Sequence, residues 1–218
     1  MKTKTFLLLS AGMLTLSSWA VPGEIIHQDI TENTAYPFTV VAQLPQEFNK
    51  LAVEDATVTY RQDGGDLCIA VEMSDGDVVT EAVADQTALN KLGDTVQIFI
   101  KPENSTHLFE VQAAPGNRKS CFFHWGAGRM FYPAATEAAP FDAKVKTVKT
   151  ASGWRAEIVF PLAEVAKKYR LEPKGAWTVQ AVRHHYGSNL SRRDTSGFPQ
   201  AVKNVSDPRR FGRLFQFK

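Results

Sequence analysis

A two-residue hydrophobic period recurs along most of this sequence and limits the folds that it can adopt more than any other feature. In residues 95–100, Val96, Ile98 and Ile100 alternate with a mixed set of neighbours, and residues 108–113 alternate in the same way. Successive side chains of a β-strand point to opposite faces, so each of these segments has one apolar face and one mixed face. The period therefore predicts an all-β protein.

Segments of this kind follow one another along the chain, with turn signals between them. The strands that we expect lie at residues 38–44, 56–61, 67–73, 95–100, 108–113, 119–125, 143–150, 154–160, 177–184 and 213–217. The turn Asp63-Gly64-Gly65-Asp66 between two of them predicts a hairpin. Many short strands in one chain are typical of a two-sheet antiparallel β-sandwich or jelly roll.

One short helix is expected among the strands. Pro161 suits the first helical position, an apolar stripe follows at Leu162, Val165 and Ala166, and the helix ends before Pro173. Because it lies between two expected strands, we interpret it as a crossover connection. The predicted architecture is therefore a sandwich with one short crossover helix.

The first twenty residues predict an export signal. Lys2 and Lys4 supply a positive start, residues 6–16 form an apolar run, and small residues precede a cleavage point after Ala20. The apolar run is too short to span a bilayer. We expect residues 1–20 to be removed and residues 21–218 to form a single domain of a secreted or periplasmic protein.

The charge balance limits the partners that the chain can attract. The sequence has 25 basic and 23 acidic residues, and two of the basic residues, Lys2 and Lys4, lie in the predicted signal. The rest of the chain is electrically balanced, so it has no long-range field to attract nucleic acid or an anionic membrane. We expect no nucleic acid partner and no membrane span.

The two cysteines, Cys68 and Cys121, belong to a chain that is predicted to enter an oxidising compartment. A disulfide between them would close a long loop and stabilise the fold by roughly 4 kcal/mol. Two buried thiols in separate strands are the alternative, because the sequence does not say whether the two Cα atoms lie close enough to bridge.

Motifs for catalysis or tight metal binding are missing from the sequence, which has no nucleophile elbow, phosphate-binding loop or dinucleotide fingerprint. His184 and His185 are adjacent on an expected strand, so they point to opposite faces and cannot easily share a metal ion. The acidic turn with Asp75 and Asp77 offers oxygen ligands that suit Ca²⁺. A solvated turn without an ion is the alternative for these two residues.

Five segments resemble, in order, the family 9 carbohydrate-binding modules. They lie at residues 93–102, 109–112, 153–162, 175–180 and 207–214, and they include Gly-Asp-Thr-Val-Gln-Ile-Phe-Ile at 93–100 and Asp-Pro-Arg-Arg-Phe-Gly-Arg-Leu at 207–214. The resemblance covers roughly residues 50–218. It implies a β-sandwich with a sugar site on one sheet, bound Ca²⁺ in known members, and an extracellular role in polysaccharide breakdown.

The resemblance also implies where a sugar would bind, although several family residues differ here. Gln97 stands where the family has a glutamate, Glu110 stands where it has an arginine, and residues 89–93 lack the family's tryptophan. The polar side chains that we expect on the mixed faces, as candidates for the sugar site, are Gln97, Glu110, Gln112, Gln180 and His184. Amides and carboxylates form paired hydrogen bonds with sugar hydroxyls.

A sugar site also needs an aromatic ring against the C–H face of the sugar. Trp125, Tyr132 or Phe198 could supply this ring, and we expect the segment 191–199 to be a loop that lines the site. The aromatic residues of the long loop at 126–141 fold back as a hydrophobic plug in the alternative interpretation.

The sequence thus favours non-catalytic binding of an oligosaccharide or polysaccharide. A haem-binding redox domain of the DOMON sandwich type is the alternative from another class, with Met73, Met130 and His124 as candidate axial ligands. A glycoside hydrolase is the enzymatic alternative, because the chain has many carboxylates, but no pair of them is singled out.

Overall fold

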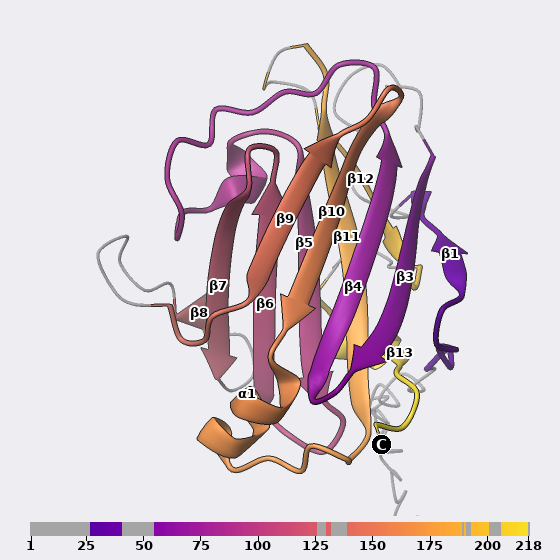
Figure 1. The fold of residues 1–218 in the computed structure, drawn as a ribbon, viewed down its shortest axis with the longest axis vertical. Coiled ribbons are helices and arrows are strands. Elements are labelled where there is room, and N and C mark those ends of the chain that lie inside the picture. Colours follow the sequence, from indigo (N-terminus) through magenta and orange to yellow (C-terminus); the bar gives the residue numbers. More distant parts are fainter. Residues whose placement is uncertain are drawn as a thin grey trace, which may run out of the picture.

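The computed structural model describes residues 27–40, 55–125, 130–131, 139–188, 190, 193–200 and 206–217. Within them, two antiparallel β-sheets are stacked face to face (Figure 1). This confirms the predicted two-sheet sandwich. The predicted export signal at residues 1–20 lies outside the described residues.

The smaller sheet is built around the predicted hairpin. Its strands, in spatial order, are β1 (Ala35–Pro37), β3 (Ala56–Asp63), β4 (Asp66–Ser74), β10 (Gly153–Phe160) and β9 (Lys144–Lys149). Asp63 pairs with Asp66 across the turn, and Gly64 has φ +59°, a conformation that glycine adopts without steric cost. The turn residues therefore explain where the hairpin reverses.

The larger sheet contains the strands that were expected to have one apolar face and one mixed face. Its order is β2 (Thr39–Val40), β12 (Arg193–Phe198), β11 (Trp177–Tyr186), β5 (Thr95–Pro102), β6 (His107–Ala114), β7 (Arg118–Trp125) and β8 (Met130–Phe131), and β13 (Gly212–Arg213) also pairs with β11. Strands β11, β5, β6 and β7 are adjacent, so residues from four long strands share one face.

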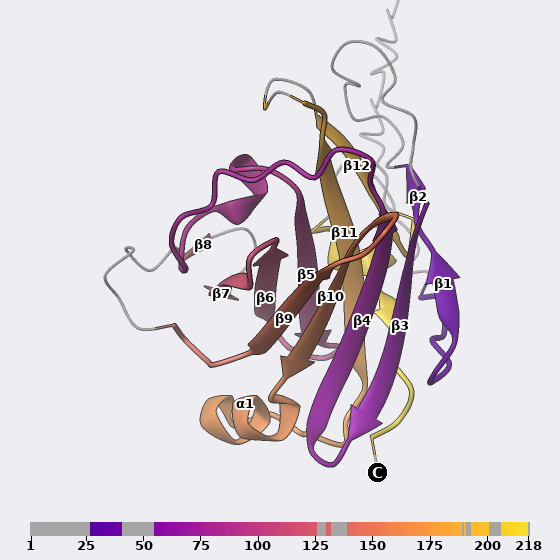
Figure 2. The ribbon, with the colours of Figure 1, turned by 45° about the horizontal axis from the view of Figure 1, so that its top comes forward.

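The predicted helix is confirmed as α1 (Leu162–Tyr169), which connects β10 in the smaller sheet to β11 in the larger one. It closes one end of the sandwich (Figure 1 and Figure 2). Leu162, Val165 and Ala166 are its buried residues, and Arg170 ends it in the left-handed conformation. Two 3₁₀ turns, η1 (Leu89–Lys91) and η2 (Pro208–Arg210), complete the elements.

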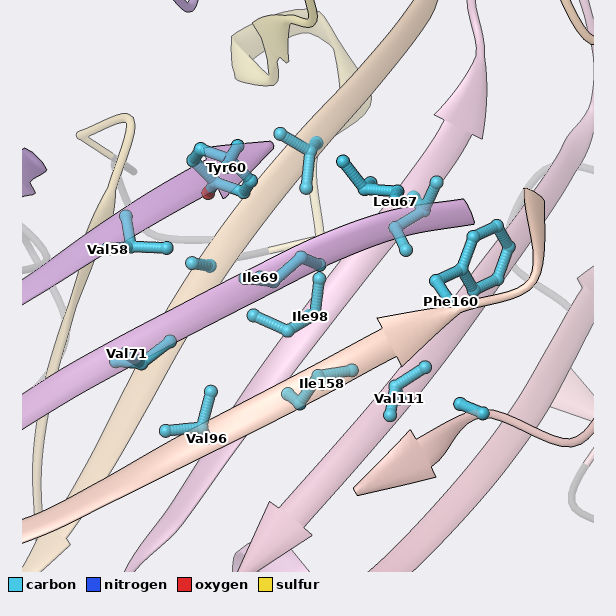
Figure 3. Close-up of a cluster of buried hydrophobic side chains, with 14 of the residues drawn as sticks. Val58, Tyr60, Leu67, Ile69, Val71, Val96, Ile98, Val111, Ile158 and Phe160 are labelled. Carbon is cyan, nitrogen blue, oxygen red and sulfur yellow. The ribbon is translucent and has the colours of Figure 1, made fainter. Parts of the chain in front are cut away.

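The core lies between the two sheets, where the apolar faces of the alternating strands meet. Val58, Ile69 and Val71 project from the smaller sheet toward Val96 and Ile98 of the larger sheet (Figure 3). Each of these side chains is at least 99% buried, and full burial of such a side chain stabilises a fold by about 1.5–3 kcal/mol. The two-residue period therefore predicts the inward face of these strands correctly.

Some strand boundaries differ from the sequence prediction. Strand β1 precedes the first strand that was expected, at residues 38–44, and the segment 191–199, expected to be a loop, contains β12. Polar residues and Gly197 dominate β12, so it lacks an apolar period and is held by its pairing with β11. The last strand, expected at residues 213–217, is only the two-residue β13, which begins one residue earlier.

The two cysteines do not form a disulfide. Cys68 lies in β4 of the smaller sheet and Cys121 in β7 of the larger sheet, and both are free and buried. Cys121 belongs to the core between the sheets, whereas Cys68 is outside that cluster. The alternative of two buried thiols in separate strands is therefore the one that the structure shows.

Candidate functional site

A row of polar side chains crosses the outer face of the larger sheet. We call it the polar strip, and its members are Gln97 from β5, Glu110 and Gln112 from β6, His124 from β7 and His184 from β11. Strand pairing places Gln97 opposite Gln112, and the inward neighbours of these residues fill the core. Alternation along adjacent strands therefore brings together four of the predicted site residues.

Glu110 is the centre of the polar strip. Its Oε1 accepts hydrogen bonds from Nε2 of Gln97 at 2.6 Å and from Nε2 of Gln112 at 2.5 Å. Its Oε2 accepts one from Nε2 of His124 at 2.7 Å. A carboxylate that is removed from water is stabilised by donors of this kind, so its neighbours on three strands hold Glu110 in place.

His184 ends the polar strip as a neutral donor. Burial, with a smaller contribution from the positive charge of Arg193, lowers the pKa of His184 to about 3. Its Nε2 lies 2.8 Å from Oε1 of Gln97. Because the amide nitrogen of Gln97 donates to Glu110, Nε2 of His184 carries the proton and donates to the amide oxygen.

The polar strip is buried, although its residues were expected on the mixed faces of their strands as candidates for a sugar site. Glu110 is fully buried, and the most exposed member, His124, is only 6% exposed. On one side of the polar strip, along the strand direction, the backbone N–H of Asn90 in η1 donates to Oε1 of Gln112 at 3.2 Å. On the opposite side of the polar strip, Phe99, Val182 and Phe211 form a small apolar cluster with Leu108.

Three other predicted site residues do not join the polar strip. Gln180 shares its face, but its amide nitrogen donates to the carbonyl of Pro199 at 2.6 Å. Phe198 faces the opposite way, into the core, where its ring stacks on Tyr36 at 4.3 Å. Trp125 ends β7, and its side chain, like all of Tyr132, lies outside the described residues.

Phe198 was misplaced because β12 was taken for a loop. Within a strand, a shift of one residue moves a side chain to the other face of the sheet. Phe198 pairs with Ala181, whose side chain belongs to the core, so the ring points inward with it. The prediction that Phe198 supplies an aromatic surface for a sugar at the polar strip is wrong.

A second polar group, which we call the interior charge cluster, lies between the sheets where β4 ends. It consists of Asp75, Asp94, Arg183 and His185, all buried. Nη2 of Arg183 lies 3.3 Å from Oδ2 of Asp75 and 2.7 Å from the carbonyl of Ser74. Nδ1 of His185 lies 3.5 Å from both Asp75 and Asp94.

The cluster shifts the pKa values of two of its members, His185 and Asp75, toward their charged forms. Burial would lower the pKa of His185, but the hydrogen bonds with Asp75 and Asp94 outweigh burial and raise the pKa to about 9. For Asp75, burial acts to raise the pKa, yet the contacts with His185, the backbone of Asp77 and Arg183 lower it overall. A protonated His185 and the guanidinium of Arg183 therefore face the carboxylate of Asp75 between the sheets.

The residues at the predicted calcium site do not fit that ion. Ca²⁺ takes six to eight oxygen ligands, whereas the group with metal-ligand geometry is Asp75, Asp94 and His185, which offers a nitrogen among three donors. Asp77 is exposed and contributes only its backbone N–H, which donates to Oδ1 of Asp75 at 3.0 Å. The guanidinium of Arg183 adds a positive charge beside Asp75.

The candidate haem ligands are engaged in other contacts. Met73 is 3% exposed and packs in the core between the sheets. Nε2 of His124 is hydrogen-bonded to Glu110. The side chain of Met130 lies outside the described residues. No residue contact described for this chain therefore favours the haem alternative.

The smaller sheet carries a pocket of about 360 Å³ at the end where β3 begins. Its polar lining residues include Asp55, Thr57, Glu72, Ser74 and Arg155. Arg155 is held by Glu157 at 3.0 Å and lies 3.7 Å from Glu72. The pocket belongs to the sheet opposite to the one that carries the polar strip.

Sequence reasoning considered His124 only as a haem ligand and did not place it in the polar strip, and it assigned no site to Asp94, Arg183 and His185. The period of β7 could have placed His124 on the same face as Glu110, given the pairing of β6 with β7. Arg183 and His185 alternate with His184, so a central strand with two inward cations signals buried carboxylate partners. The identity of those partners depends on contacts between segments far apart in the chain, which the sequence alone does not supply.

Comparisons with known proteins identify the fold. No family model matches the sequence, and no curated protein sequence matches it. Among solved structures, a candidate carbohydrate-binding protein of Bacteroides uniformis is 13% identical with a TM-score of 0.63, over 85% of this chain and 86% of that chain.

Two further similar structures are family 9 carbohydrate-binding modules of Caldicellulosiruptor kristjanssonii. One, solved with cellotriose, is 12% identical with a TM-score of 0.51, over 87% of this chain and 92% of that chain. The other, solved with glucose, is 13% identical with a TM-score of 0.53, over 88% and 95%. The fold expected from the sequence resemblance, that of the family 9 modules, is confirmed.

Proposed function

We propose that this protein is an exported, non-catalytic carbohydrate-binding protein and that its sugar site is the polar strip on the larger sheet. The observation that carries the proposal is the position of Glu110, fully buried among four other polar side chains on an outer sheet face. The inner faces hold a sandwich together, and a buried carboxylate on an outer face costs stability unless donors compensate it. Groups retained at such a cost are candidates for function.

The residues of the polar strip are at most 6% exposed, so a sugar reaches them only by displacing the groups that cover them. The hydrogen bonds within the polar strip then leave capacity for a ligand. Glu110 accepts three hydrogen bonds, whereas a carboxylate has about four acceptor positions. Gln97 and Gln112 each use one amide N–H toward Glu110, and a primary amide has two. A sugar hydroxyl both donates and accepts, so adjacent hydroxyls suit this combination of groups.

The charge of the polar strip favours a neutral sugar. The carboxylate of Glu110 would repel a uronic acid or a sulfated sugar that approached it. Cellotriose and glucose, which occupy two of the proteins with a similar fold, are neutral sugars. We therefore take neutral hexoses and their oligosaccharides as the class of ligand.

The proposed setting is outside the cytoplasm, in the breakdown of polysaccharides. The positive start, short apolar run and small residues before residue 21 support export. Among the described parts of the chain, no helix is long and apolar enough to cross a bilayer.

Isothermal titration calorimetry tests the sugar site. Glucose, cellotriose and a panel of neutral oligosaccharides are titrated into the mature protein, with a polyuronate for comparison. We expect binding heat with at least one neutral sugar, and about tenfold weaker binding after Gln97→Ala or Gln112→Ala, because each loses a hydrogen bond to the ligand. Absence of heat with every sugar in the panel would contradict the proposal.

Arg155→Ala is the matched control, because Arg155 lines the pocket on the smaller sheet. We expect this variant to bind sugar as the wild type does, with circular dichroism showing that all variants are folded. If Arg155→Ala weakens binding while Gln97→Ala and Gln112→Ala do not, the sugar site lies at the pocket and the assignment to the polar strip is wrong.

A further inference from the structure

The interior charge cluster connects the two sheets. Asp75 directly follows β4 of the smaller sheet, whereas Arg183 and His185 lie on β11 of the larger sheet and Asp94 directly precedes β5. Asp94 is also tied to the backbone, because its two oxygens accept from the N–H groups of Val79 at 2.6 Å and Tyr186 at 2.7 Å. The cluster therefore holds strand ends from both sheets in fixed positions.

Three members of this cluster have the geometry of a metal site. One ligand atom from each of Asp75, Asp94 and His185 lies within 4.8 Å of the others. Carboxylate oxygens with an imidazole nitrogen form a donor set that zinc and similar transition metals accept. On geometry alone, these three residues would be taken for a metal centre.

The position of Arg183 argues against that interpretation. Its Nη2 lies 3.3 Å from Oδ2 of Asp75 and 3.2 Å from Nδ1 of His185, so it contacts two of the three candidate ligand residues. A metal bonded to that oxygen of Asp75 would lie within about 6 Å of the guanidinium, since such bonds are about 2.0–2.6 Å long. Two like charges at that separation in a buried site repel each other strongly.

We propose that the guanidinium of Arg183 takes the place of a metal ion in the interior charge cluster, so that the two sheets are joined by an internal cation and not by a bound one. Arg183 is 2% exposed, and its Nη2 is also anchored by the carbonyl of Ser74. The cluster is then complete without any ion from solution. The proposal is independent of the sugar site, because it concerns the opposite face of β11.

The first experiment uses the wild-type protein after dialysis against EDTA. We expect 1 mM Ca²⁺ or Zn²⁺ to change the thermal midpoint by less than about 1 °C and to leave the His185 imidazole signals unchanged in NMR spectra, because no bound ion contributes to stability. A metal-dependent rise in the midpoint together with shifted His185 signals would overturn the proposal. This measurement needs no variant, so it holds even if substitutions in the cluster prevent folding.

The second experiment removes the internal cation with Arg183→Met, which keeps an unbranched side chain without the charge. We expect this variant to be less stable than the wild type and to regain stability with Zn²⁺, by about 5 °C or more at a hundredfold excess over the dissociation constant. Adding His185→Ala removes one of the three ligand atoms and should abolish that gain. A folded Arg183→Met protein that Zn²⁺ does not stabilise would contradict the proposal.

Discussion

Glu110 shows how the larger sheet can hold a charge on its outer face. Its carboxylate is fully buried, and it tolerates burial because donors on β5, β6 and β7 share its two oxygens. Removing one partner of such a buried group leaves the others without compensation, which costs more than the hydrogen bond itself contributes. Substitution of Glu110 or of one of its three donors is therefore expected to destabilise this face.

We predict that Glu110→Gln destabilises the protein by about 1.5–3 kcal/mol. The amide keeps the shape of the side chain. Its NH₂ group, however, would face N–H donors that bond to a carboxylate oxygen in the wild type, and two donors cannot bond to each other. Urea denaturation measures the change. Glu72→Gln is the control, because Glu72 is 66% exposed and its substitution should cost no more than about 0.5 kcal/mol. Equal effects of the two substitutions would contradict this view of Glu110.

His185 gives stability a defined dependence on pH. Its folded-state pKa is raised to about 9, above the unfolded value near 6.5, by Asp75 and Asp94 against the opposing effects of burial and Arg183. Asp194 of β12 pairs with His185 of β11, and its carboxyl also faces the His185 ring. The stability contributed by His185 is therefore fully present below about pH 6.5 and is lost as pH rises through about 9.

We predict that the thermal midpoint of the wild type falls between pH 7 and pH 10, and that His185→Gln shows a smaller fall over the same range. The substitution removes the proton whose binding stabilises the folded state. Thermal denaturation at half-unit pH intervals measures both profiles. Parallel profiles for the two proteins would show that His185 does not cause the dependence.

The polar residues of the site could be predicted only in part from the sequence. Alternation placed Gln97, Glu110 and Gln112 on one face because they lie on long strands with clear apolar partners. It could not show that they bond to one another, since that depends on how two strands are paired. The contact between Asp94 and His185 joins positions far apart in the chain, and no local pattern encodes it.

At the scale of elements, the β3–β4 hairpin and α1 are fitted closely to each other. The carbonyl of Gly65 accepts a hydrogen bond from the backbone N–H of Ala163 at 2.9 Å. A Cβ atom at Gly65 would lie 2.8 Å from Cβ of Ala163, whereas one at Gly64 would meet nothing within 4 Å. The two glycines of one turn are therefore required for different reasons, close approach at Gly65 and positive φ at Gly64.

We predict that Gly65→Ala destabilises the protein by about 1–3 kcal/mol through overlap with Ala163, and that Ala163→Gly in the same chain recovers part of the loss. Gly64→Ala should cost about 1–2 kcal/mol from its left-handed backbone, with no recovery from Ala163→Gly. Urea denaturation of the single and double variants forms the two cycles. Strict additivity of Gly65→Ala and Ala163→Gly would rule out the steric cause.

The elements themselves were predictable where a strand has an apolar face of its own. The hairpin, the helix and the long strands of both sheets follow from period, turn residues and helix stripe. Strand β12 was missed because its polar sequence is ordered by pairing with β11, and β1 was missed because it has only three residues. Tertiary pairing, and not local preference, decides such segments.

For the whole molecule, the arrangement separates three features. The polar strip lies on the outer face of the larger sheet, the interior charge cluster lies between the sheets, and the pocket lies on the smaller sheet. The sequence predicted the two sheets because these follow from the two-residue period. It did not predict that the polar strip is buried, because burial of one face depends on what the rest of the chain places against it.

The proposed export makes a prediction about the mature chain. If residues 1–20 are removed, the protein recovered from the periplasm or medium of an expressing bacterium begins at Val21, which intact-mass measurement detects. Replacing two leucines of the apolar run with arginine should retain the full-length protein in the cytoplasm, because the apolar run is what the export machinery recognises. A full-length protein outside the cytoplasm would contradict cleavage after Ala20.

Strand β11 presents His184 to one face of its sheet and Arg183 and His185 to the other. Inserting or deleting one residue near its middle would move these side chains to the opposite faces of the sheet. Arg183 and His185 would then lie where His184 donates as a neutral ring, and His184 would lie where carboxylates need cations. Insertions or deletions of two residues would preserve the alternation. Evolution and protein engineering should therefore accept length changes in β11 only in even steps, so this strand is a reliable anchor for aligning distant relatives.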